Sequence, residues 1–395
     1  MSLFASRPRT DARLAKRREP RYAFLDRVDR PEYQSIRDLL DQWFGRYPGS
    51  ASADLRGRFA ADNDAHNGAF FELFLHELLS RSGFSVSVGG VGQPDFLAVA
   101  GDGVPFYLEA TTVNPKSSLW ASDPLMDDVL DALDEIDSPG FRLNIQVSGK
   151  LSQLPRRWEV IRPFQNFVRA HDPDIVEETI RSKGLRAAPA LKVTHGTWSL
   201  TATLMPKPAH RRGPGFGRPI GVGPTRGGFV DAVNPVRDAL LDKAAKYRNL
   251  AAPYVIAVNA PDLDDRIDEM QVLFGDEQFV YQFGSDDLEP EFTRKRNGLW
   301  YRGGDRPRAT HVDAVLFFRG VAPWHLADVH SCLYLNPYIA QRLNVTPLTL
   351  PFASAENDDM KWHGGERLGT ILGLDARWPL ESSGPTFHSS TGAPI

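Results

Sequence analysis

The chain has 395 residues, of which 42% are hydrophobic and 24% are charged, and these proportions are typical of a soluble globular protein. The formal net charge of −4 excludes a uniformly basic nucleic-acid binder, so phosphate would have to be bound by local patches of Lys and Arg. The single cysteine, Cys332, excludes an internal disulfide framework, and with no apolar run long enough to span a membrane it indicates a cytoplasmic location.

Residues 7–30 form a basic segment in which nine Lys and Arg stand against four Asp and Glu. Such an arm, taken as residues 1–32, would lie along the phosphates of a nucleic acid. The alternative is a solvated and partly disordered terminus, because the segment has few apolar residues to bury. An apolar stripe at helical spacing then predicts a helix over residues 33–47, where the main domain, residues 33–380, begins.

An amphipathic helix and three short strands are predicted in residues 70–113. The helix carries Glu72 on the flank of its apolar stripe, where a charged side chain is not expected without a partner. Asp95 opens the second strand. Glu109 lies on the third strand and shares a face with Thr111, because side chains alternate along a strand.

These positions predict that three carboxylates converge: Glu72, Asp95 and Glu109. Two like charges about 4 Å apart repel by roughly 4 kcal/mol at an effective dielectric of about 20. The cluster is therefore stable only when one carboxyl is protonated or a cation lies between them. Oxygen ligands suit Mg²⁺, and the arrangement meets the electrostatic requirement of a metal-dependent phosphodiesterase.

The order of a helix Glu, a Pro-Asp before a strand, a hairpin and a strand Glu resembles the PD-(D/E)XK nuclease superfamily. The matching residues are Glu72, Pro94-Asp95 and Glu109-Ala110-Thr111. The resemblance implies a restriction-endonuclease-like core that binds Mg²⁺, or Mn²⁺ in its place, through Asp95, Glu109, Glu72 and the carbonyl of Ala110. The lysine of that superfamily would fall at Thr111, so either the site is inactive or another lysine serves it.

Residues 123–205 are predicted to form three helices and two strands, at 123–136, 141–147, 158–170, 173–183 and 198–205. A loop over residues 207–228 follows, rich in Gly and Pro and without an acid; its cations are Lys207, Arg211, Arg212, Arg218 and Arg226. The loop is expected either to clamp a nucleic-acid backbone or to form a solvated connection. Residues around 150–233 are therefore read as an insertion into the main domain.

The next helix is predicted over residues 234–250, opened by Asn234 as cap and Pro235 in the first turn. Lys243 and Tyr247 fall within its apolar stripe. Lys243 is read either as a lysine whose stem packs while its amine reaches water, or as the missing catalytic lysine. Several branches of the superfamily place a Lys on this helix with a Tyr one turn on, so the resemblance favours Lys243 with Tyr247 in support. Lys116 and Lys246 are the rival candidates.

The strand predicted over residues 254–260 is apolar throughout, so it should lie centrally with both faces covered. Residues 262–291 carry eleven acids and a net charge of −10, which favours a solvated, mobile flank. Further strands are expected at 300–301, 311–319 and 332–335, extending the sheet. Residues 381–395 are expected to be a disordered tail.

The combined prediction is an α/β protein with a mixed central sheet flanked by helices, a large insertion and extra C-terminal strands. Its expected function is that of a magnesium-dependent endonuclease acting on DNA, with RNA as the alternative substrate. The resemblance suggests restriction, phage defence or repair, with a homodimer or a defence-system protein as partner and no membrane. The alternatives are a catalytically inactive nucleic-acid-binding module of the same fold and an interaction protein that uses its acidic flank.

Overall fold

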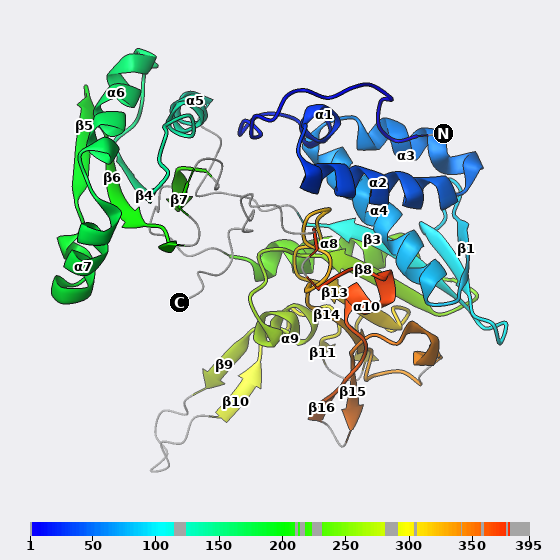
Figure 1. Cartoon of the computed structure of the whole chain (residues 1–395). Helices are drawn as coiled ribbons and strands as arrows, with labels where there is room; N and C mark the ends of the chain where they lie inside the picture. Colours follow the sequence, from blue (N-terminus) through cyan, green and yellow to red (C-terminus); the bar gives the residue numbers. More distant parts are fainter. Residues whose placement is uncertain are drawn as a thin grey trace, which may run out of the picture.

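The protein is described by a computed structural model that covers residues 2–113, 124–209, 212–213, 218–222, 231–280, 291–303, 306–340, 342–356, 359–376 and 378–379. Its centre is a mixed sheet of eight strands in the order β1-β2-β3-β8-β13-β14-β15-β16, with helices on both faces (Figure 1). This is the α/β architecture with a mixed central sheet that the sequence predicts. In the parts of the chain that the structure describes, no helix has the length and apolar character needed to cross a membrane.

The central sheet combines an antiparallel meander with a parallel centre. The meander consists of β1 (Ser85–Val88), β2 (Phe96–Val99) and β3 (Pro105–Thr112). β8 (Tyr254–Asn259) runs parallel to both β3 and β13 (Ala314–Phe318). The remaining strands are β14 (Ser331–Leu335), β15 (Phe352–Glu356) and β16 (Asp359–His363). β8 is buried along its whole length, which confirms the predicted central strand.

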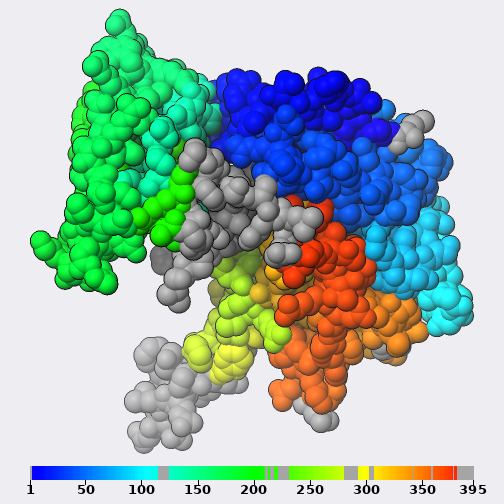
Figure 2. All heavy atoms as spheres, viewed as in Figure 1, coloured from blue at the N-terminus to red at the C-terminus, as the bar shows by residue number. Residues whose placement is uncertain are grey.

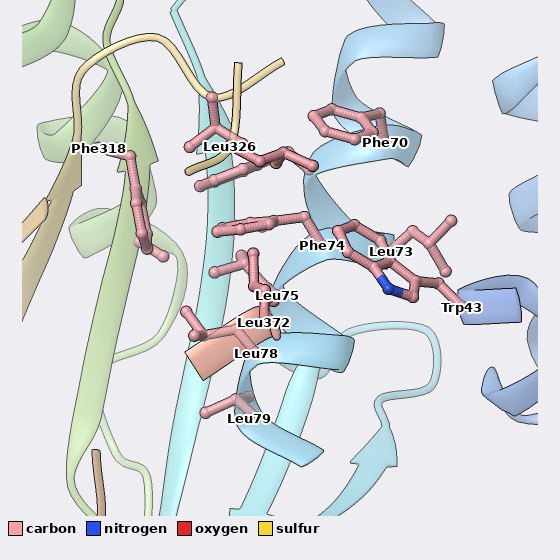
Figure 3. Close-up of a cluster of buried hydrophobic side chains, with 14 of the residues drawn as sticks. Trp43, Phe70, Leu73, Phe74, Leu75, Leu78, Leu79, Phe318, Leu326 and Leu372 are labelled. Atoms are coloured by element: carbon pink, nitrogen blue, oxygen red, sulfur yellow. The ribbon is translucent and has the colours of Figure 1, made fainter. Parts of the chain in front are cut away.

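One face of the sheet is covered by N-terminal helices and a short C-terminal one. These are α1 (Arg21–Arg27), α2 (Pro31–Arg46), α3 (Gly49–Phe59), α4 (Asn63–Arg81) and α10 (Leu368–Leu372). The Asp62 carboxylate caps α4 by accepting the backbone N–H groups of Asp64 and Ala65. Phe74 of α4 meets Phe318 of the sheet edge-on, with ring centroids 5.2 Å apart (Figure 3). Each such fully buried side chain contributes about 1.5–3 kcal/mol, so α4 is firmly attached to the sheet.

The other face is covered by α8 (Val233–Lys246) and α9 (Arg266–Phe274). The prediction for α8 was wrong at both ends. Asn234 is not the cap: the helix begins one residue earlier, and the Asp231 carboxylate accepts the Asn234 N–H at 3.0 Å. The helix also stops at Lys246, so Tyr247 lies just beyond its end.

The acidic flank is only partly what its composition predicts. Residues 266–274 form α9, which buries Val272 and Leu273 against the sheet. Glu269 of this helix has no exposed surface, and its carboxylate accepts hydrogen bonds from Arg319 at 2.8 Å and Tyr334 at 2.6 Å. A charged group can be buried when it is paired, so the expectation of a solvated segment was wrong for α9. Residues 281–290 lie outside the described part.

Some expected strands also differ. The strand expected at 300–301 is replaced by a short ribbon of β11 (Arg302–Gly303) and β12 (Arg306–Pro307), which does not join the central sheet. β9 (Glu277–Val280) and β10 (Glu291–Arg294) form a second separate ribbon (Figure 1). The strands predicted at 311–319 and 332–335 are confirmed as β13 and β14 of the central sheet.

Residues 124–222 form a module with its own hydrophobic core, visible as a separate lobe beside the N-terminal helices (Figure 2). Its sheet has the order β5-β6-β4-β7. The strands are β4 (Phe141–Ser148), β5 (Ala190–His195), β6 (Trp198–Pro206) and β7 (Ile220–Val222). The helices are α5 (Pro124–Leu133), α6 (Arg157–Arg169) and α7 (Pro173–Lys183). The module starts ahead of residue 150 because α5 belongs to the same core.

The basic N-terminal segment is folded onto the protein. Leu3 and Phe4 are buried in the core of the main domain. The arginines of the segment face acids of this chain: Arg7 and Arg9 both contact Asp26. Two further arginines, Arg17 and Arg18, bind Asp131 and Asp128 of α5, and Arg17 also binds Asp134 just beyond the end of that helix. This segment is therefore an ordered strap between two parts of the fold.

Candidate active site

Glu109 lies in the middle of β3, and its side chain has no exposed surface. Alternation along the strand places Leu108 and Ala110 in the core under α4, while Tyr107 packs in the core under α8. Glu109 therefore faces α8, on the same side of β3 as Tyr107. Thr111 lies two residues further along β3 and is partly exposed.

Two lysines of α8 converge on a single oxygen of Glu109. Lys243 Nζ donates to Glu109 Oε1 at 2.7 Å, and Lys246 Nζ donates to the same atom at 3.0 Å. The two lysines are three residues apart, so they lie on one face of the helix. The sequence assignment of Lys243 to the carboxylate cluster agrees with this contact, and Lys246 joins it.

Asp95 and β3 are joined by two hydrogen bonds. The Asp95 carboxylate accepts the Ala110 N–H through Oδ2 at 2.7 Å, and the Asp95 N–H donates to Glu109 Oε2 at 3.2 Å. Asp95 stands immediately before β2, which pairs with β3 starting at Phe96 and Leu108. The two carboxylates that the sequence pattern singles out are therefore neighbours across the hairpin.

The electrostatic surroundings of Asp95 are unfavourable to its charged form. Burial is the largest cause of a raised pKa at the Asp95 carboxyl, followed by the nearby carboxylates of Glu109 and Glu72, and together they bring it to about 6. The Ala110 N–H and the Lys243 ammonium oppose this shift without cancelling it. Burial and the two neighbouring carboxylates therefore favour the neutral form of Asp95, and a cation bound beside it would favour the charged form.

Glu72 of α4 lies near enough for its charge to act on Asp95, but its carboxylate is bound by an arginine that sequence reasoning missed. Arg58 of α3 donates to both carboxylate oxygens of Glu72, each at 2.7 Å. Arg58 also donates to Asp54 at 2.9 Å. Only the packing of α3 against α4 brings Arg58 to Glu72, and no spacing in the sequence signals that contact.

Two tyrosines fix the elements around the lysines. The Tyr247 hydroxyl donates to the Gln93 carbonyl at 2.6 Å and so fastens the turn that leads into Asp95. The Tyr254 hydroxyl donates to the Lys243 carbonyl at 3.2 Å. The Tyr247 side chain, followed by Glu109, raises the pKa of the Lys246 ammonium, which also lies 4.9 Å from the Tyr247 ring centroid. Tyr247 thus supports the site through the backbone and through Lys246.

The side chains of the site balance in number, with three carboxylates (Glu72, Asp95, Glu109) and three cations (Arg58, Lys243, Lys246). Within the described part of the chain, no group of three or more His, Cys, Asp and Glu side chains is gathered for a metal ion. Asp95 and Glu109 offer the oxygen ligands that Mg²⁺ prefers, and a cation bound beside Asp95 would favour its charged form, which burial disfavours.

The cations of the loop predicted to bind nucleic acid make internal contacts where they are described. Lys207 is buried and donates to the Ser138 carbonyl at 2.8 Å. Arg212 binds two acids of α7, and Arg218 binds Asp134 and the Ala15 carbonyl. Arg211, Arg226 and the rival lysine Lys116 lie outside the described residues. Nucleic-acid binding by this loop stays a prediction. To bind a phosphate, Arg212 and Arg218 would have to leave the carboxylates that they contact in this structure.

A groove separate from the carboxylates has a cavity volume of about 410 Å³. Its lining includes Arg266, Trp362 and Arg367, together with Asp328 and Glu366. Its charged side chains cancel in number, so the groove favours neither an anion nor a cation.

Comparison of the chain with protein-family models, with curated proteins and with solved structures finds no match. Any assignment of function therefore depends on the site itself.

Proposed function

We propose that this protein is a metal-dependent nuclease of the PD-(D/E)XK type that hydrolyses phosphodiester bonds of DNA. The observation that carries the proposal is the meeting of Asp95, Glu109 and Lys243 from three separate segments of the chain. Two neighbouring carboxylates and one ammonium are the groups that the resemblance requires. They also meet the chemical needs of phosphodiester hydrolysis, which are metal ligands and a cation for the developing charge.

The residues would divide the work as follows. Asp95 and Glu109, with the Ala110 carbonyl, would hold Mg²⁺ or Mn²⁺, and Glu72 would take part directly or through water once Arg58 releases it. A divalent cation bound there supplies a water of lowered pKa as nucleophile. Lys243 would orient that water or stabilise the charge that develops on the phosphoryl oxygens, where a preorganised donor is most effective. Tyr247 would keep the turn before Asp95 in place.

A second candidate is a nucleic-acid-binding module of the same fold without turnover. The balance of three cations against three carboxylates favours it, because such a cluster can be neutral without a metal ion. Thr111, which cannot supply a positive charge, points in the same direction. This candidate predicts binding of nucleic acid with no cleavage in any divalent metal.

The test is cleavage of labelled DNA and RNA by the full chain in Mg²⁺, in Mn²⁺ and in excess chelator. We expect metal-dependent cuts in DNA, lost in Asp95→Asn and Glu109→Gln. Glu356→Gln is the matched control, since Glu356 is a surface carboxylate paired with Lys361 at 2.7 Å. Cleavage that persists in chelator, or that survives both site variants, would contradict the nuclease. Binding without cleavage would favour the second candidate.

A further inference from the structure

The two lysines that share Glu109 Oε1 differ in exposure and in their place on α8. The Lys243 side chain is 27% exposed, and the backbone carbonyl of Lys243 accepts the Tyr254 hydroxyl. The Lys246 side chain is 50% exposed, and Lys246 is the last residue of α8. Although the Lys246 ammonium also lies 4.9 Å from the Tyr247 ring centroid, Lys246 is the more exposed of the two lysines and the one at the helix end.

A divalent cation and two ammonium groups cannot share this carboxylate. The second oxygen, Glu109 Oε2, already accepts the Asp95 N–H at 3.2 Å. The first oxygen has both ammonium nitrogens within 3.0 Å. Charges of the same sign crowded on one oxygen repel, so a cation that reaches Oε1 must displace at least one lysine.

We propose that Lys246 is a displaceable counter-ion of Glu109. In the metal-free protein the Lys246 ammonium neutralises the buried Glu109 carboxylate. Once a divalent cation binds, the ammonium leaves Glu109 and contacts a phosphate of the nucleic acid other than the one that is cleaved. Lys243 keeps its place at the site. This inference rests on the proposed nuclease function and assigns to Lys246 a positioning role, which the resemblance did not give it.

The first test measures Mn²⁺ binding to the full chain by calorimetry, without nucleic acid. Lys246→Met removes the charge and keeps most of the apolar stem, so Mn²⁺ no longer has to displace an ammonium. We expect roughly three- to tenfold tighter Mn²⁺ binding, the range of a single charge at a partly exposed site. Lys361→Met is the control, because Lys361 also pairs with a carboxylate, Glu356, outside the site. Unchanged or weaker Mn²⁺ binding by Lys246→Met, with a normal unfolding transition, overturns the inference.

The second test follows DNA binding against salt, in Ca²⁺ and in chelator. With Ca²⁺ in the site, the released Lys246 should contact a phosphate, so Lys246→Met should lower the log–log salt slope by roughly one unit. In chelator Lys246 remains on Glu109, and the slope should not change. An equal effect in both conditions, or in neither, overturns the inference. A wild-type chain that binds neither Mn²⁺ nor DNA would instead refute the proposed function, and the inference with it.

Discussion

Arg58 and Glu72 form a bidentate ion pair, in which Arg58 Nη1 lies 2.7 Å from Glu72 Oε1 and Arg58 Nη2 lies 2.7 Å from Glu72 Oε2. Such forked pairs are among the stronger hydrogen-bonded contacts in proteins, because the planar guanidinium matches the carboxylate. The Glu72 carboxylate helps to raise the pKa of Asp95. Arg58 therefore offsets part of the repulsion within the carboxylate cluster.

The first prediction concerns this arginine. Arg58→Met leaves the Glu72 charge without its partner, so the pKa of Asp95, already about 6, should rise by roughly one further unit. Carboxyl carbon NMR in metal-free buffer would measure it. Arg58→Lys keeps the positive charge and loses the bidentate contact with Glu72, so the rise in the pKa of Asp95 should be smaller than in Arg58→Met. A pKa of Asp95 that stays in place or falls in Arg58→Met would show that Arg58 does not act on the cluster.

The second prediction concerns stability. The folded protein raises the pKa of Asp95 from its ordinary value of 3.8 to about 6, so between these values the folded state binds more protons than the unfolded state. The contribution of Asp95 to stability therefore falls as pH rises through this window, by up to about 3 kcal/mol. Asp95→Asn removes the titration and retains an oxygen that can accept the Ala110 N–H.

Without metal, Asp95→Asn should accordingly be more stable than the wild type above pH 6, and the difference should shrink as the pH falls towards 4. Denaturant unfolding in chelator at several pH values measures this. A wild type that is the more stable of the two at pH 8 would contradict the raised pKa. Excess Mg²⁺ should narrow the gap, because only the wild type gains a full ligand.

The third prediction separates the lysines in the reaction. Lys243→Met should slow single-turnover cleavage about a hundredfold or more, the usual loss when a preorganised donor to the transition state is removed. DNA affinity should change only a few-fold, since the interaction is strongest in the transition state. Lys246→Met should mainly weaken DNA binding, and Lys116→Met should change neither the cleavage rate nor the DNA affinity. Wild-type cleavage by Lys243→Met with loss in Lys116→Met would place the catalytic cation just after β3.

The fourth prediction concerns the loop after β6. Arg212 is held by Asp174 at 2.5 Å and Glu177 at 2.8 Å, so it is not free to bind phosphate without a loss elsewhere. We expect Arg212→Ala to change the salt slope of DNA binding by less than one unit, and the double variant with Arg211→Ala by up to about one. A drop of two units would show that Arg212 exchanges its acids for the nucleic acid.

Local rules account for much of the fold and for half of the site. Alternation along β3 predicts that Glu109 and Thr111 share a face, and helical spacing predicts that Lys243 lies in the buried stripe of α8. These rules work because each concerns one element and its own periodicity. Lys246 was named as a rival, and its shared contact with Glu109 follows from the direction in which α8 crosses β3.

The contacts that sequence reasoning missed are between elements. Arg58 reaches Glu72 because α3 packs on α4, and neither helix signals the other in its spacing. Val272 and Leu273 of α9 are buried, but the many acids around them in the sequence dominate its composition, and composition alone therefore predicts a solvated segment. The ion pairs of Arg17 and Arg18 could not be predicted because their partners in α5 lie more than a hundred residues further along the chain.

The strap from the N-terminus to the module has a consequence for how the chain can be cut. Arg17 lies 2.8 Å from Asp131, and Arg218 Nη2 donates to the Ala15 carbonyl at 2.5 Å. A chain shortened to begin after residue 18 would lose both links, and the cluster of acids on α5 would then face solvent without its arginines. The described part of residues 124–222 would keep its own core but would lose these contacts to the N-terminal residues. The first eighteen residues thus bind the module directly, although they precede it in the chain by more than a hundred residues.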